Sequence, residues 1–442
     1  MTTATTDRAG RADRPAPPPL LRDRRFLRLW TAQSVSQLGD RISELALPLI
    51  AVTALHATAV QVSLLTALAW APNLLGLLFG AWVDQRPGKR RLMITADLVR
   101  AAALATLPLA HLLDAVSLGQ LYAVAVVTGS AGVLFNSAYS PFFVRLVPRS
   151  QYVEANSRLS TSRSASYLVG PAIGGALVQA LTAPVAVLTD AVSFLASAAL
   201  LGRLPVTEEP APAGDAQPPM LARARAGLAF TLRHPVLRAS LGCCTTVNFF
   251  TFMAAGLTLF FASRTLGLSA SAIGLALGAG ATGSLLGAVL APRISRAIGV
   301  GRAIAAGAVL FPAPTALVAV AAGPLWARAG ALTAAEFLAG AGVMLFDINL
   351  NSLQARVIPD ALRSRVSGAF GTVNYGARPL GALAGGLLAA AIGTRATLLA
   401  AAIGGCLAVL WLLPSPIPGL RSLDSVDPLA SLDEPAPAVT AP

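Results

Sequence analysis

The segment Leu134-Phe-Asn-Ser-Ala-Tyr-Ser-Pro-Phe-Phe-Val-Arg145-Leu-Val-Pro148 is a mostly apolar run that ends in Arg-x-x-Pro. The pattern returns 211 positions later, as Leu345-Phe-Asp-Ile-Asn-Leu-Asn-Ser-Leu-Gln-Ala-Arg356-Val-Ile-Pro359. The same shift superposes other residues without a gap, for example Gly170 on Gly381. The sequence therefore predicts a chain built from two related halves.

Apolar runs fill the chain from Leu27 to Leu413, and a helix of about 20 apolar residues crosses a bilayer. Only 12% of the 442 residues are charged and 55% are hydrophobic, whereas about 25% are charged in soluble domains. We expect an all-α integral membrane protein with twelve transmembrane helices in two parallel-repeat six-helix halves. The predicted spans lie near 27–54, 60–83, 92–113, 118–146, 154–181, 184–204, 237–263, 270–291, 302–323, 328–357, 363–391 and 394–413.

The polar and proline-rich segments divide the chain further. Residues 1–25 and 415–442 are predicted to be disordered cytoplasmic tails, because they are polar and rich in proline. The N-terminal half covers 26–204 and the C-terminal half 237–414. The cytoplasmic linker 205–236 contains an amphipathic helix at Met220–His234.

The positive charges predict the orientation. Most of the 33 Lys and Arg residues fall on one side of the predicted spans, and only Arg264, Arg328 and Arg395 fall on the other. Because positive loops stay in the cytoplasm, both termini are expected there, in the cytoplasmic (inner) membrane of a bacterium. The net charge of +13 does not indicate nucleic-acid binding, since no basic helix carries interleaved aromatic residues.

Ionisable residues inside the spans form stripes. In the first span, Gln37, Asp40 and Glu44 share one helix face, and Asp40 lies about half-way along. In the tenth span, Glu336 and Asp347 share a face. Such residues are costly in a bilayer and usually line a protein interior that serves function. We expect the stripes to face a central cavity.

A transporter driven by protons needs carboxylates whose proton affinity changes as the cavity opens to each side. The candidates for proton coupling are Asp40, Glu44, Glu336 and Asp347. The candidates for counter-ions or cavity residues are Arg41, Arg163, Arg378, Gln37 and Asn374. The alternative is a set of ion pairs that fix helix register. Asp97 and Arg100 are one turn apart, and we interpret them as such a structural pair near the cytoplasmic end of the third span; Asp190 receives no role.

Other motifs carry no chemistry. Gly278-Ala-Gly280-Ala-Thr-Gly283 lies inside the eighth span rather than after a strand, so close helix packing is expected and not dinucleotide binding. Lys89 is the only lysine and Arg90 follows it, so no phosphate-binding loop exists, and an ion gradient is the expected energy source. The three histidines are isolated in the sequence. No metal and no cofactor are expected.

The loop Gly80-Ala-Trp-Val-Asp84-Gln-Arg86-Pro-Gly88-Lys89-Arg90-Arg91 resembles the loop motif of the major facilitator superfamily. The resemblance implies that Asp84 faces the N-terminus of the eleventh helix, near Ser364 to Gly368, and that the basic residues latch the cytoplasmic side. Gln85 departs from the pattern, because a basic residue is usual there. The alternative is a loop that is positive only because it is cytoplasmic.

The segment Ser166-Tyr-Leu-Val-Gly170-Pro171-Ala-Ile-Gly174-Gly175 is similar to the motif of proton-coupled antiporters, with Ser166 in place of a glycine. In that family this face packs against the eighth span and is associated with export. Small-residue packing alone is the alternative.

These motifs resemble the efflux branch of the superfamily, which includes enterobactin and macrolide exporters. The resemblance implies a secondary transporter that exchanges protons for a hydrophobic or amphiphilic small molecule such as a drug, antibiotic or siderophore. We expect a monomer, and not an enzyme, because the paired halves carry no convergent nucleophile or metal set. Alternatives are a proton-coupled solute importer of the same fold and a membrane sensor that transports nothing.

Overall fold

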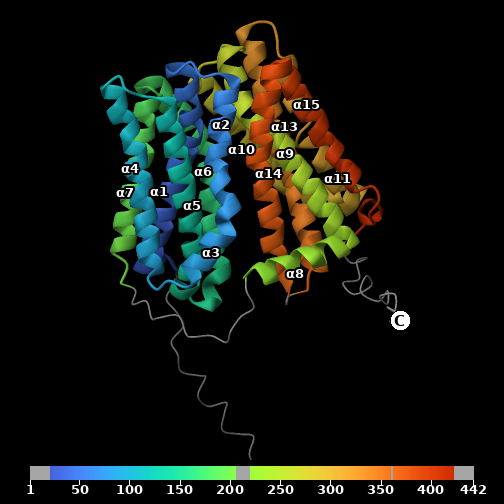
Figure 1. Cartoon of the computed structure of the whole chain (residues 1–442). Coiled ribbons are helices and arrows are strands. Elements are labelled where there is room, and N and C mark those ends of the chain that lie inside the picture. Colours follow the sequence, from blue (N-terminus) through green and yellow to red (C-terminus); the bar gives the residue numbers. More distant parts are fainter. Residues whose placement is uncertain (1–19, 206–219, 360–361, 423–442) are drawn as a thin grey trace, which may run out of the picture.

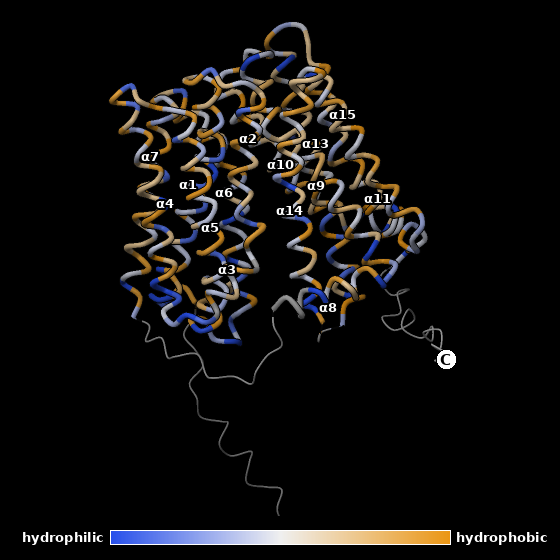
Figure 2. The backbone as a smooth tube through the Cα atoms, viewed as in Figure 1, coloured by the Kyte–Doolittle hydropathy of each residue, from blue (hydrophilic) through white to orange (hydrophobic). Residues whose placement is uncertain are grey.

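The computed structural model of the chain describes residues 20–205, 220–359 and 362–422 (Figure 1). These ranges are helical throughout, with no strand among them. Figure 1 shows α1–α7 side by side in one group and α9–α15 in another, while α8 lies across the lower end of the second group. In Figure 2 the lower ends of the helices are largely hydrophilic and their middle parts largely hydrophobic.

The first group of helices comprises α1 (Arg24–Leu49), α2 (Ala59–Trp70), α3 (Gly76–Asp84), α4 (Lys89–Leu112), α5 (Leu118–Leu146), α6 (Tyr152–Leu181) and α7 (Ala183–Gly202). After α8 (Met220–Arg233) come α9 (Pro235–Arg264), α10 (Ala270–Ile298), α11 (Val300–Leu310), α12 (Thr315–Val320), α13 (Leu325–Val357), α14 (Arg363–Ile392) and α15 (Thr394–Cys406). Short turns of other helix types are η2 (Leu20–Arg22), η3 (Ile50–Ala54), η4 (Ala71–Leu75), η5 (Arg149–Gln151), η7 (Leu407–Trp411) and η8 (Ile417–Gly419).

Nine helical segments of the described chain are long and apolar enough to cross a membrane. The remaining predicted spans correspond to α1, to α2 with α3, and to α14. The second of these is interrupted after Trp70, where Pro72 lacks an N–H group and the chain forms the turn η4. Polar residues lower the hydropathy of α1 and α14, among them Asp40 and Glu44 of α1 and Asn374 and Arg378 of α14.

The two terminal segments differ from the prediction at their inner ends. Residues 20–25 form η2 and the start of α1 with Asp23 as its N-cap, and Leu20 is fully buried in a cluster with Phe26. At the other end Ile417 is buried, and the carbonyl of Leu420 accepts a hydrogen bond of 3.0 Å from the N–H of Gly301. The predicted tails 1–25 and 415–442 were therefore too long, because their apolar residues close the ends of the bundle. Residues 1–19 and 423–442 lie outside the described ranges, as does linker segment 206–219.

Glycines let α10 and α13 pack with their backbones in contact. A Cβ atom at Gly280 would lie 3.2 Å from the carbonyl oxygen of Glu336, and one at Gly287 would lie 2.5 Å from that of Ala341. At Gly283 it would overlap the carbonyl oxygen of Phe337. The glycines of the Gly-x-Gly-x-x-Gly segment thus serve helix packing, as expected from the sequence.

We predict that Gly283→Leu prevents stable packing of α10 on α13, because the added side chain has no space beside the backbone of Phe337. Overpacking of this kind costs about 1–3 kcal/mol or more. The thermal stability of the purified protein in detergent, followed by size-exclusion chromatography, measures it. Gly330→Leu is the matched control, since nothing lies within 4 Å of a Cβ atom at Gly330. Equal stability of the two variants would contradict this packing.

Close contacts at two glycines help to join the groups of helices. Gly175 of α6 packs on α10, where its added Cβ atom would lie 3.1 Å from the Cα atom of Gly274. Gly386 of α14 packs on α2, where the corresponding distance to the Cβ atom of Ser63 is 2.7 Å. The helix α8 packs on the first turns of α14, and Gly227 lies against the backbone of Arg365.

Candidate functional site

Two adjoining cavities lie beside the polar face of α1. The smaller, about 310 Å³, is enclosed by helices of the first group and is called the inner cavity. The larger, about 770 Å³, is called the central cavity, because α14 closes it opposite α1, α3, α5 and α6. Asp40, Trp70 and Asn73 line both. The central cavity therefore lies between the two groups of helices, and Asp40 stands where the two cavities meet.

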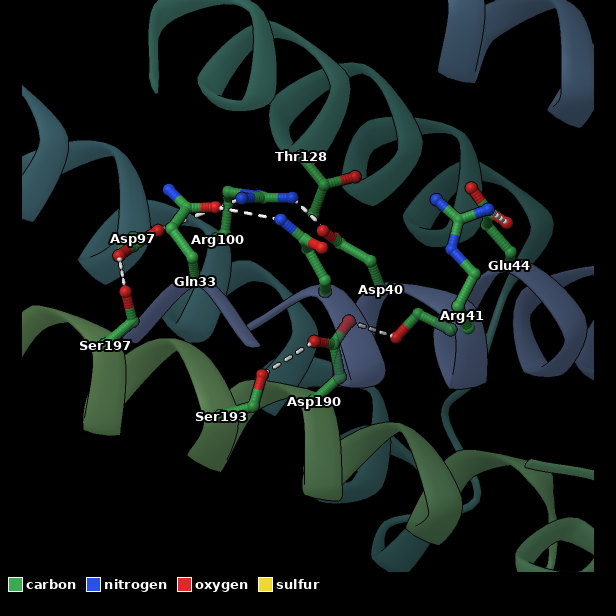
Figure 3. A network of polar contacts seen from close by, with 12 residues as sticks. Gln33, Asp40, Arg41, Glu44, Asp97, Arg100, Thr128, Asp190, Ser193 and Ser197 are labelled. Carbon is green, nitrogen blue, oxygen red and sulfur yellow. Dashed lines mark hydrogen bonds and ion pairs between the residues drawn. The ribbon is translucent and has the colours of Figure 1, made fainter. Parts of the chain in front are cut away.

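Asp40 forms an ion pair with an arginine of α4 (Figure 3). Arg100 donates from Nη2 to Oδ1 of Asp40 over 2.6 Å, and its Nη1 is 3.8 Å from Oδ1 of Asp97. Asp97 is fully buried and accepts a hydrogen bond of 2.6 Å from the hydroxyl of Ser197 on α7. The guanidinium of Arg100 also lies 3.9 Å from the ring centre of Phe194. One arginine thus stands between two carboxylates, with Asp40 the nearer.

A further carboxylate, Asp190 of α7, lines the inner cavity and is 1% exposed. It accepts hydrogen bonds from the hydroxyls of Ser43 on α1 and Ser193 (Figure 3). Gly39 makes this approach of α7 to α1 feasible, because a Cβ atom there would overlap Oδ1 of Asp190. Sequence reasoning assigned Asp190 no role, and the structure places it in the wall beside Asp40.

Arg41 and Glu44 form an ion pair on the adjacent part of α1. The side chain of Arg41 is 20% exposed and that of Glu44 52%. The guanidinium of Arg41 also covers the ring of Tyr167 on α6 at 4.2 Å. Arg41 therefore acts as the counter-ion of Glu44, while Arg100 takes that place for Asp40.

The residues predicted for proton coupling or for the cavity separate into two sets. Gln37, Asp40, Arg41, Arg163 and Arg378 all line the central cavity. Oδ1 of Asn374 accepts a hydrogen bond of 3.5 Å from Nδ2 of Asn248 on α9. Neither Glu336 nor Asp347 lines either cavity. The backbone of Glu336 instead packs against Gly280 of α10.

Arg378 of α14 is surrounded by aromatic rings. Its guanidinium carbon is 4.5 Å from the ring centres of Trp70 and Tyr375 and 4.9 Å from that of Phe252. Its Nε donates a hydrogen bond of 2.9 Å to Oδ1 of Asn248. Trp70 also packs on Phe252 at 5.0 Å, edge to face. These rings come from both groups of helices and close the end of the cavity around Arg378.

Asp97 and Arg100 were interpreted as a structural pair near the end of the third span. The position along the helix is wrong, and the pair has a further partner. The helix α4 runs from Lys89 to Leu112, so Arg100 lies at its middle. There it reaches across to Asp40 as well as to Asp97. Counting residues from the basic loop could have placed Arg100 at this depth, but its partner on α1 depends on helix rotation.

The basic loop after α3 caps helix ends. Lys89 is buried and donates to the carbonyl oxygens of Val83 and Arg86, the latter over 2.9 Å. Arg90 donates to the carbonyl oxygen of Leu204 beyond the end of α7. Gly88 has a φ of +81°, which turns the chain into α4. The side chains of Asp84 and Ser364 lie outside the described part, and so does the predicted latch between them.

The small residues of the predicted antiporter motif hold α6 against two helices. Gly174 packs on α1, where its Cβ atom would lie 3.2 Å from the Cα atom of Ile42, and Gly170 lies beside Arg41. Gly175 packs on α10. Ser166 faces the central cavity. Pro171 lies within α6, and its carbonyl contacts Gly274 of α10. The motif thus forms part of the junction between the groups of helices.

Comparison with known proteins agrees with this architecture. The chain is 28% identical over 405 residues to the multidrug efflux pump Tap of Mycolicibacterium fortuitum, covering 87% of this chain and 94% of the pump. It is 27% identical over 403 residues to the MFS-type transporter YfiS of Bacillus subtilis, covering 89% of this chain and 93% of that transporter. A bacterial homologue of the iron transporter ferroportin, solved in an inward-facing state, has the same fold, with a TM-score of 0.69 at 17% identity over 88% of this chain and 98% of the homologue.

The profile of the transmembrane secretion effector family matches residues 16–441. Its members and the relatives above are transporters and not enzymes. The chain therefore belongs to the transmembrane secretion effector family of the major facilitator superfamily.

Proposed function

We propose that the protein is a proton-coupled antiporter that exports a hydrophobic or amphiphilic small molecule by alternating access. The observation that carries the proposal is the ion pair of Asp40 and Arg100 in the wall of a cavity between two groups of helices. In this proposal the chain crosses the cytoplasmic membrane of a bacterium twelve times as a monomer. Its termini lie in the cytoplasm, and each group of helices is one six-helix half.

In this proposal Arg100 couples proton uptake to a change of conformation by exchanging one carboxylate partner, Asp40, for another, Asp97. When Asp40 takes up a proton it loses its charge, and its attraction for Arg100 falls. Arg100 then has a second carboxylate in Asp97, only 3.8 Å away. Asp97 lies on α4 with Arg100, so this exchange of partners would release the ion pair that ties α4 to α1. Asp40 is the first candidate for the proton carrier, with Glu44, Glu336 and Asp347 as the others.

The contacts around the central cavity support a state open to the cytoplasm. The cavity extends along α14 from Arg378 to Gly368, toward the end of the helix that α8 covers. At the opposite end of the molecule Arg264 of α9 donates to the carbonyl oxygen of Val52 and contacts Nδ1 of His56, both at 2.7 Å. In the proposed orientation this contact closes the extracellular side. We call it the outer clamp.

Export rather than import is favoured by the similarity to the multidrug efflux pump Tap over most of both chains. A proton-coupled importer would use the same cavity and the same ion pair. The direction in which protons move the substrate separates the two functions.

We expect cells that express the chain to accumulate less of a fluorescent amphiphile such as Nile red than cells carrying an empty vector. The difference should vanish when an uncoupler collapses the proton gradient, because the gradient drives export. Cell fluorescence at equal protein expression measures the effect. Higher accumulation on expression would overturn the proposal and support the importer.

A further inference from the structure

We propose that the central cavity binds amphiphiles that carry a compact anionic group, and that Arg163 and Arg378 supply the positive charge that meets it. The anionic group is a carboxylate, sulfonate or phosphate attached to an apolar, preferably aromatic, body. This inference rests on the proposed function, because it names the substrate class of the same cavity.

The charged residues of the cavity do not balance. Its lining includes one carboxylate, Asp40, and three arginines: Arg41, Arg163 and Arg378. Asp40 is paired with Arg100 from the inner cavity, and Arg41 is paired with Glu44. Among the side chains that the structure describes, no carboxylate oxygen lies within 4.0 Å of a nitrogen of Arg163 or Arg378. Two positive charges of the wall therefore lack an ion-pair partner.

Asp347 of α13 is a further carboxylate that interacts electrostatically with Arg378. It does not reach ion-pair distance of Arg378, and it does not line the cavity. A ligand that fills the cavity displaces the water that solvates the arginines, and an unpaired charge without water is costly. An anionic ligand restores a partner, whereas a cationic ligand adds repulsion. The wall thus selects for negative charge.

Arg378 is held in a fixed orientation for such a contact. Asn248 accepts the hydrogen bond from Nε, and three rings surround the guanidinium at 4.5–4.9 Å. No hydrogen bond from its two terminal nitrogens to a described residue is found. A guanidinium fixed at Nε presents these two nitrogens as a fork, the geometry that carboxylates and phosphates bind in bidentate fashion.

Exposed aromatic rings beside the arginines suit an apolar body. Tyr167 of α6 and Tyr375 of α14 are 48% and 42% exposed, and both line the central cavity. Trp70 lies in the same wall and stacks on Tyr375 at 6.4 Å. Pockets that combine such rings with a few fixed polar groups bind small molecules whose apolar and polar parts match them. The combination fits an aromatic acid better than an aromatic base.

The test compares two probes with the same pyrene body and chain length, 1-pyrenebutyrate, which ends in a carboxylate, and 1-pyrenebutanol, which ends in an uncharged hydroxyl. The full chain is purified and placed in nanodiscs of phosphatidylcholine, and empty nanodiscs correct for probe dissolved in lipid. Energy transfer from tryptophan to pyrene measures binding. We expect pyrenebutyrate to bind about tenfold or more tightly than pyrenebutanol, as a charge-assisted bidentate contact requires. Equal affinities, or tighter binding of the alcohol, would overturn the inference.

Substitutions at the two arginines test whether they contact the anionic group of the probe. Arg163→Gln and Arg378→Gln should each remove most of the preference for the acid, measured as the ratio of the affinities for the two probes. Arg163→Lys should keep the preference because the charge stays, whereas Arg378→Lys should keep only part of it, because an ammonium group cannot form the bidentate contact. Arg149→Gln is the control, because Arg149 is exposed on η5 outside both cavities. Displacement of pyrenebutyrate by phosphatidylglycerol added to the nanodiscs would assign the arginines to a lipid headgroup and contradict the inference.

Binding is measured without a proton gradient, so the two proposals fail separately. A preference for the acid with no export in cells would leave the inference standing and refute the exporter. Export in cells with no preference for the acid would refute the inference alone.

Discussion

Asp40→Asn is expected to reduce proton-driven efflux to the level of cells without the protein. Asparagine keeps the size of the side chain and removes the group that takes up the proton. It also leaves Arg100 with Asp97 as its only carboxylate partner among the residues that contact it in the structure. The initial rate of amphiphile efflux from energised cells measures the effect.

Two controls separate coupling from folding in this variant. Asp114→Asn makes the same chemical change in an exposed loop residue, and its efflux should equal that of the wild type. Exchange of labelled for unlabelled substrate across vesicles needs no net proton movement, so Asp40→Asn should retain it. An Asp40→Asn protein with full efflux would exclude Asp40 as the proton carrier and leave Glu44, Glu336 and Asp347.

Arg264→Ala is expected to open the extracellular side. The variant removes both contacts of the outer clamp, to Val52 and to His56, while α9 keeps its own packing. A hydrogen bond from a charged donor contributes about 1.5–3 kcal/mol, and 1.4 kcal/mol corresponds to about a tenfold change in population. The outward-open state should therefore become about tenfold more populated or more.

Labelling of a cysteine at position 73 measures this population. Asn73 lines both cavities, so in a protein whose native cysteines are replaced by serine, Asn73→Cys reports access from outside to an impermeant maleimide. Arg328→Ala is the matched control: Arg328 also donates to carbonyl oxygens on this side, those of Gly323 and Leu266, but both belong to its own group of helices. Equal labelling rates in the two variants would show that the clamp does not hold the state closed.

Residues along one helix were easy to place from the sequence. The periodicity of α1 put Gln37, Asp40 and Glu44 on one face, and this face lines the cavities. Helical geometry alone fixes which residues share a face. The direction of that face was inferable because polar residues avoid lipid.

Contacts between helices were not predictable in the same way. The partner of Asp40 is Arg100 and not the adjacent Arg41, because the rotation of α4 about its axis decides which residue it presents to α1. Asp190 escaped prediction for a related reason. Its partners Ser43 and Ser193 are ordinary residues in the sequence, and only the close approach of α7 at Gly39 brings them together.

The polar stripe of α13 shows a further limit of prediction from the sequence. Glu336 and Asp347 recur at helical spacing, but α13 packs tightly on α10 through glycines, and this face does not line either cavity. A stripe of polar residues predicts an interior position and not which interior it meets.

The most direct test of proton-driven export uses the purified protein in liposomes with an imposed pH gradient. Antiport predicts that vesicles with an acidic interior accumulate the external amphiphile against its gradient as protons leave, that an uncoupler abolishes this uptake, and that Asp40→Asn vesicles lack it. Uptake that needs an alkaline interior, or that ignores the gradient, would contradict the account.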